Sequence, residues 1–164
     1  MLRWRLLNDS RKYQPFERCD GVLGQVNGIT VVFESVERRT TCRVPDPILL
    51  VLNVRCPPND VTLGLDARYR AIFEAWVPER TAARDRGERG PDPPERPDAF
   101  LNDLPLALAD DVGTVYGEPR QKSAGGSGTE WQGRWYFETL PPPEARSLTV
   151  SLDVPGGRTH TMPL

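Results

Sequence analysis

Ile48-Leu-Leu-Val-Leu-Asn-Val54 is the stretch that decides the fold class, because six of its seven residues are apolar. A strand with one face in solvent alternates apolar and polar residues, whereas this run is apolar on both faces. Such a run belongs in the middle of a sheet or under a covering element. Pro45 and Pro47 bracket Asp46 just before it, and a central strand is expected to follow them.

Three further segments predict strands around this one. Gly28–Val36 is rich in β-branched residues and follows an Asn-Gly turn signal, so it is expected to pair with residues 48–54. The alternation within Trp131–Phe137 places its two tryptophans and its phenylalanine on one strand face, where core packing is expected. The clearest alternation runs through Ser147–Val154, with leucine and valine toward the core and polar residues toward solvent.

One segment has the spacing of a helix, which we predict at about residues 65–76. Its apolar residues recur at intervals of three and four: Leu65, Tyr69, Ile72, Phe73 and Trp76. Asp66 could cap the start of this helix, and Pro78 is expected to end it. Local alternation around Tyr69 also allows a strand. We interpret the apolar stripe as a lid over an open end of a sandwich rather than as a cofactor site.

Residues 79–98 (ERTAARDRGERGPDPPERPD) carry almost no apolar side chain. They cannot bury enough surface to offset the entropy of ordering, so we predict a long, disordered and mobile charged loop. A partner-binding segment is the alternative to a solvated linker. The predicted organisation is an N-terminal arm at 1–20, a single domain at 21–157 and a C-terminal tail at 158–164.

Short strands separated by turn signals, with little helix, predict a mainly β fold. The expected architecture is an antiparallel sandwich of two layers with one short helix.

The second half of the chain presents short motifs in a distinctive order: Leu106–Tyr116, a Gly-rich tip at 123–128, Trp131–Phe137, Leu140-Pro-Pro-Pro143 and Leu148-Thr-Val150. In this order the chain resembles the small uncharacterised immunoglobulin-like β-sandwich proteins of high-GC Gram-positive bacteria. More distantly, it is similar to the telokin-like accessory domains of bacterial cell-surface proteins. The resemblance covers about residues 22–155. It implies an immunoglobulin-like sandwich and carries over no catalytic residue.

Composition and charge argue against several classes of partner. A formal net charge of -2 gives no electrostatic reason to expect nucleic acid or an anionic membrane. No apolar run approaches the roughly 20 residues that a membrane helix needs. Charge interrupts the apolar N-terminus too soon for a signal peptide. We therefore expect a soluble, cytoplasmic protein without nucleic-acid partner or membrane insertion; secretion from a different start site is the alternative.

Few residues offer catalytic chemistry. His160, the only histidine, lies in the predicted tail and is expected to be solvated rather than to act as a base. Cys19, Cys42 and Cys56 lack C-x-x-C spacing, so free buried thiols are expected. The chain has no Gly-x-Ser-x-Gly elbow, P-loop or dinucleotide fingerprint. We predict no catalytic residue and no cofactor.

Asp110 and Asp111, with Asp103 nearby, are the weak candidates for a metal site. Their oxygens are hard ligands of the kind that Ca²⁺ takes. Adjacent aspartates followed by Val-Gly are more often turn residues that bond their own backbone, so no metal is predicted.

Two surfaces are candidates for binding. Trp4 with Arg3 and Arg5 forms an aromatic and basic cluster, expected to dock on the domain or on a second copy. Tyr136 is expected to point away from the neighbouring core aromatics, toward solvent. A carbohydrate or nucleic-acid stacking platform on Trp131–Phe137 is the alternative to core packing.

These features favour a non-enzymatic protein-interaction or accessory module. Its expected partner is another protein or a second copy of the chain. The alternative function is a hydrolase or metal-dependent enzyme with its site at one end of the sandwich.

Overall fold

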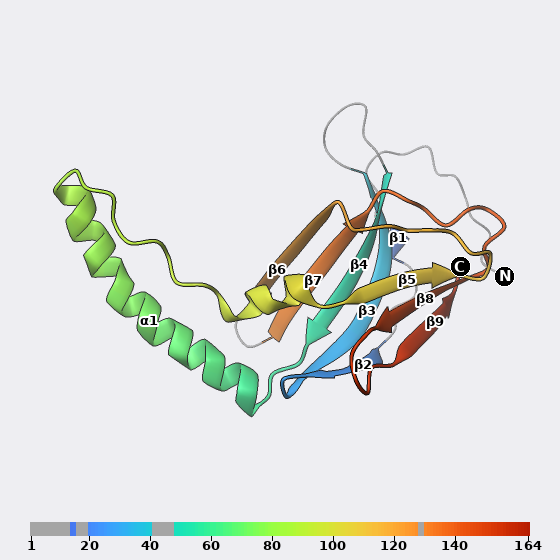
Figure 1. Cartoon of the computed structure of the whole chain (residues 1–164), viewed down its shortest axis with the longest axis horizontal. Coiled ribbons are helices and arrows are strands. Elements are labelled where there is room, and N and C mark those ends of the chain that lie inside the picture. The colour runs from blue at the N-terminus through green and yellow to red at the C-terminus, as the bar shows by residue number, and fades with distance from the viewer. Residues whose placement is uncertain (1–13, 16–19, 41–47, 128–129) are drawn as a thin grey trace.

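Two antiparallel β-sheets form the body of the chain in the computed structural model, which describes residues 14–15, 20–40, 48–127 and 130–164 (Figure 1). In the larger sheet the described strands run in the order β1-β3-β4-β7-β6, and β2 also pairs with β3. Their bounds are β1 Gln14–Pro15, β2 Gly21–Val26, β3 Ile29–Thr40, β4 Ile48–Cys56, β6 Gln121–Ser127 and β7 Glu130–Phe137. The smaller sheet has the order β5-β8-β9, with β5 Leu106–Asp110, β8 Ser147–Leu152 and β9 Thr159–Pro163.

Strand β4 is the centre of the larger sheet, as its sequence predicts. It is hydrogen-bonded to β3 on one edge and to β7 on the other. Leu50, Leu52 and Val54 on its inner face are fully buried, and Leu49 and Val51 on its outer face are almost as well covered. Backbone pairing on both edges satisfies the polar groups that this burial takes out of water.

The core lies between the two sheets and draws side chains from both. Trp131, Trp135 and Phe137 on β7 are each no more than 2% exposed, which confirms the predicted core face of that strand. Leu148 and Val150 on β8 are fully buried opposite, in the predicted alternation. The mainly β, antiparallel prediction is confirmed. An immunoglobulin-like arrangement of the strands is not confirmed.

The turn between β2 and β3 follows its sequence signal. Asn27 and Gly28 have φ of 52° and 79°, the left-handed pair of a two-residue hairpin turn. The carbonyl of Gly28 also accepts a hydrogen bond from the Asn59 side chain at 2.8 Å. This turn therefore holds the residue at which the main helix begins.

The helix predicted at residues 65–76 is present but much longer, because α1 runs over 26 residues, Asp60–Asp85. Its cap is Asn59 and not Asp66. The Asn59 side chain accepts from the Thr62 amide, and the Asn59 amide donates to the Thr62 hydroxyl, both at 2.9 Å. This reciprocal capping starts the helix five residues before the first apolar repeat.

The prediction that Pro78 ends the helix is wrong. An interior proline removes one backbone hydrogen bond at a cost of about 3 kcal/mol. On either side of Pro78, the Trp76 indole and the Arg80 guanidinium both donate to the Pro91 carbonyl at 3.0 Å. The extended chain at 86–96 thus holds both sides of the proline in place.

The long disordered charged loop expected at 79–98 is not shown. Residues 79–85 are helical, 86–96 return along the helix, and 97 begins the 3₁₀ helix η1, Pro97–Asp103. Disorder was predicted from composition, because these residues have almost no apolar side chains. The order here comes from polar bonds to Pro91 and from the buried Ala83.

The apolar stripe of α1 does not cover an open end of the sandwich. Figure 1 shows α1 running away from both sheets, with the chain returning alongside it. Leu65 near the helix start packs against the core, whereas Ile72, Phe73 and Val77 are exposed. No helix in the described part of the chain is long and apolar enough to cross a membrane.

The two chain ends differ from their predictions in different ways. Most of the expected tail at 158–164 forms β9, whose Met162 is 1% exposed in the core. Of the expected arm at 1–20, the structure describes only Gln14, Pro15 and Asp20, and the first two pair with β3.

Trp135→Ala should destabilise the fold by about 3–5 kcal/mol, because it removes a buried aromatic from the core. Arg134→Ala is the matched control, since Arg134 is the exposed neighbour on the same strand. Its effect should stay within about 0.5 kcal/mol. Urea denaturation of both variants measures the difference. Equal midpoints for Trp135→Ala and wild type would contradict the placement of this side chain in the core.

Candidate functional site

Helix α1 is rigidly attached to the sheets at its base. Both carboxylate oxygens of Asp66 lie 3.1 Å from the indole nitrogen of Trp131, which donates to them from β7. Thr62 is fully buried beside the cap. The direction in which the helix leaves the body is therefore set by hydrogen bonds to both β7 and the β2–β3 turn.

One side of α1 is closed by aromatic rings and the returning chain. The Tyr69 and Phe73 ring centroids lie 5.8 Å apart, and those of Phe73 and Trp76 lie 5.4 Å apart. The Arg80 guanidinium lies 5.7 Å from the Trp76 ring, within cation–π range. Together with the bonds to Pro91, these contacts stiffen the helix far from the core.

The neighbouring side of α1 is open, and we call it the open flank: Val61, Arg68, Ile72, Ala75 and Glu79. At 100° per residue these five residues fall within an arc of roughly 60°. All five are exposed, and Ile72 at its middle is 53% exposed. Ile72 is the most exposed large apolar side chain of α1, so it is the candidate contact point on this helix.

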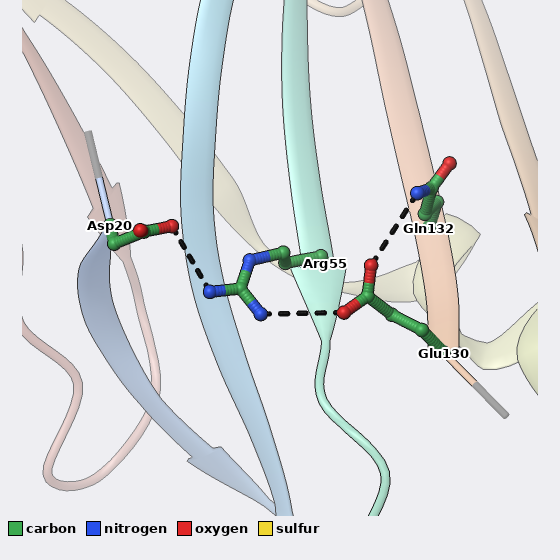
Figure 2. Close-up of polar contacts among 4 residues, drawn as sticks. All are labelled: Asp20, Arg55, Glu130 and Gln132. Atoms are coloured by element: carbon green, nitrogen blue, oxygen red, sulfur yellow. Dashed lines mark hydrogen bonds and ion pairs between the residues drawn. The ribbon is translucent and has the colours of Figure 1, made fainter. Parts of the chain in front are cut away.

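A second cluster lies on the outer face of the larger sheet (Figure 2). Arg55 on β4 donates to Asp20 at 3.0 Å and to Glu130 on β7 at 3.4 Å, and Gln132 donates to Glu130 at 3.5 Å. The hydrogen bond that Arg55 donates to Asp20 is the main cause that raises the pKa of Arg55. Both carboxylates are engaged with the guanidinium, so this cluster ties strands together rather than presenting a free acid or base.

Beside this cluster the sheet has an open hollow of about 270 Å³ over β6 and β7, lined by Ser123, Ala124, Gly125, Gly126, Gln132 and Arg134. Its glycines leave the strand surface bare of side chains. Enclosed, mostly apolar cavities with convergent polar groups are typical of ligand sites. This hollow is open and has Arg134 as its charged residue, so it does not have that character.

The predicted metal candidates are used as turn residues. Asp110 accepts from the amides of Val112 and Thr114 and from the Tyr116 hydroxyl, and Asp111 accepts from the amides of residues 146 and 147. Asp103 is exposed at the end of η1. Within the described ranges, no three His, Cys, Asp or Glu residues are grouped so that they could hold a metal ion.

His160 and Cys56 are both packed against other residues. His160 is half-buried on β9, its ring centroid 5.3 Å from that of Phe33, so it is not the solvated tail residue expected from sequence. Burial, with the charge of Glu130, raises the pKa of the Cys56 thiol to about 12. A thiol held protonated in this way is a poor nucleophile. Cys19 and Cys42 lie outside the described residues.

Of the predicted interaction residues, the structure describes only Tyr136. Trp4, Arg3 and Arg5 lie outside the described residues. Tyr136 is half-buried on the outer face of β7, opposite Val51 of β4. The predicted helix at about 65–76 contains Arg68, Ile72 and Ala75, but Ile72 was assigned to a stripe covering the sandwich. Val61 and Glu79 fell outside the predicted helix, although the Asn59 and Thr62 spacing marks its true start.

Comparisons with protein-family models, with curated proteins and with solved structures found no match. The resemblance to immunoglobulin-like proteins therefore stays a prediction. Arguments about function rest on the geometry of the described residues.

Part of the free energy of unfolding should depend on pH through the Asp110 carboxyl. Burial acts to raise the pKa of Asp110, but the hydrogen bonds from Thr114, Tyr116 and Val112 outweigh it and lower the pKa to about 2. The unfolded carboxyl titrates near pH 4, so this contribution is complete above about pH 4 and is lost as the pH falls toward 2. The Asp110→Asn variant should lack this pH-dependent contribution to stability.

Chemical denaturation between pH 6 and pH 2 tests this expectation. The stability difference between wild type and Asp110→Asn should shrink as the pH falls. Asp103→Asn is the control, because the Asp103 carboxylate accepts no hydrogen bond from the described residues. Parallel curves for wild type and Asp110→Asn would contradict the hydrogen-bond geometry at this turn.

Proposed function

We propose that the chain is a non-enzymatic protein-interaction module and that α1 is the element that binds the partner. The observation that carries this proposal is the projection of a 26-residue helix, fixed at its base, with Ile72 exposed at its middle. Rigid helices that present aliphatic anchors are a common way to recognise a helix or groove on another protein. We also propose that the body is an immunoglobulin-like accessory domain that carries this helix.

The rigidity of α1 supports this role. Most helices in proteins owe their stability to packing rather than to intrinsic propensity, and ordering a helix on binding would reduce affinity. The Asn59 cap, the bond between Asp66 and Trp131, and the contacts to Pro91 order α1 before any partner arrives. The exposed side chains are thus presented in a fixed arrangement.

The alternative is hydrolysis or metal-dependent catalysis at the Asp110 turn. Such chemistry needs carboxylate oxygens free to bind a metal or to take a proton. Asp110 and Asp111 already accept hydrogen bonds from backbone amides and from the Tyr116 hydroxyl. The hydrogen bonding at this turn therefore favours the interaction module.

Ile72→Glu should abolish or strongly weaken partner binding without changing the thermal melt. Ala67→Glu is the matched control, because it adds the same charge to an exposed position about 140° around the helix from Ile72. Tagged chain is expressed in its native cell, bound proteins are identified, and binding is repeated with the purified partner. Binding should survive Ala67→Glu and be lost with Ile72→Glu.

Two outcomes would contradict the proposal. One is partner binding that is equally strong in both variants. The other is turnover by the purified chain, in a hydrolase panel with divalent cations, that disappears when Asp110 and Asp111 are changed to Asn.

A further inference from the structure

We infer that the open flank of α1 binds the same flank of a second copy of this chain, with the two helices antiparallel. This inference rests on the proposed function, because it names the partner that the helix holds.

The spacing of the open flank is that of a helix pair. The positions on this side of α1 follow one another at intervals of four and three: Val61, Leu65, Arg68, Ile72, Ala75, Glu79 and Ala82. Residues at these intervals stay on the side that faces a partner helix along its whole length. Leu65 packs on the core at the base of the helix. The other six side chains are exposed, and two of them, Glu79 and Ala82, lie beyond Pro78.

The charges on this flank are self-complementary only when the helices are antiparallel. With Ile72 set against Ala75 of the second copy, Arg68 lies opposite Glu79 of that copy, and the twofold axis repeats both contacts. Arg68 and Glu79 of one chain are eleven residues apart, about 16 Å along the helix, too far to pair with each other. Neither forms an ion pair among the described residues. A parallel pair would place like charges together.

The shape of the chain permits this register. The twofold axis passes between Phe73 and Glu74, near the middle of α1, so the helices overlap along most of their length. Because α1 leads away from the sheets, the two β bodies lie at opposite ends of the pair (Figure 1). The returning chain bonds to Trp76 and Arg80 on the adjoining side and leaves the flank uncovered. The small Ala75 lets the backbones approach around Ile72.

The charge balance of α1 favours a second copy over nucleic acid or an anionic membrane. The helix carries four arginines and five carboxylates. Both of those other partners need an excess of positive charge on the binding face. Association of two copies is reversible, so the dimer population should depend on concentration.

Sedimentation equilibrium of the full chain over a wide concentration range tests the pairing. Wild type should dimerise. Arg68→Glu and Glu79→Arg, each alone, should raise the dimer Kd roughly tenfold, because each replaces two attractive contacts with two repulsive ones. The double variant Arg68→Glu/Glu79→Arg restores opposite charges across the pair and should return the Kd to near the wild-type value. Arg70→Glu, the same charge change on the far side of α1, should leave it unchanged.

Circular dichroism melts test whether each variant is folded. If one single variant is unstable, the Kd of the double variant can still be compared with those of the wild type and of the other single variant. A double variant no tighter than the single variants would overturn the pairing, as would a monomeric wild type at every concentration. A monomeric wild type that still binds another protein in an Ile72-dependent manner would overturn the pairing and leave the interaction module standing. A monomeric wild type that shows no Ile72-dependent binding would contradict both the pairing of two copies and the interaction module.

Discussion

The burial of β4 on both faces is the constraint on which the rest of the structure depends. A strand removed from water on both sides must have both backbone edges paired, and β3 and β7 supply those pairs. Because β7 alternates, its pairing with β4 turns Trp131, Trp135 and Phe137 inward together, and the smaller sheet then covers them. The order of the strands in the larger sheet and the position of the core both follow from this requirement.

Trp131 connects the core of the sheets to helix α1. An unpaired buried donor costs about 1–3 kcal/mol, and the buried indole of Trp131 avoids this cost by donating its N–H to an acceptor. The indole N–H of Trp135, by contrast, has no partner among the described residues. The acceptor for Trp131 is Asp66 in the second turn of α1, so the same side chain that fills the core also holds the helix. Phe100 of η1 packs edge-on against this ring at 5.8 Å. The chain therefore leaves the body and returns to it at one tryptophan.

The sequence was sufficient for the elements whose order comes from apolar burial. A continuous apolar run located β4, alternation located β7 and β8, and the Asn-Gly pair located the β2–β3 turn. It failed where polar bonds decide the structure. Helix α1 continues past Pro78 because Trp76 and Arg80, on either side of that proline, donate hydrogen bonds to the Pro91 carbonyl further along the chain, and no local pattern records that contact. Strand β9 was missed because Met162 is its one strong apolar signal. The candidate site was reached only in part, since Ile72 was recognised as helical but assigned to a buried stripe.

The excursion from Asp60 to residue 96 is larger than the fold requires. Both of its ends lie at Trp131, so a short connection between β4 and η1 would serve the core equally well. Each ordered residue of the distal helix gives up about 1–2 kcal/mol of backbone entropy, and Ile72 and Val77 recover little of it because they stay exposed. Hydrogen bonds to Pro91 nevertheless keep this part helical. Because the distal part of α1 is ordered without contributing to the core, the proposed interaction role is assigned to the side chains of α1 and not to those of the sheets.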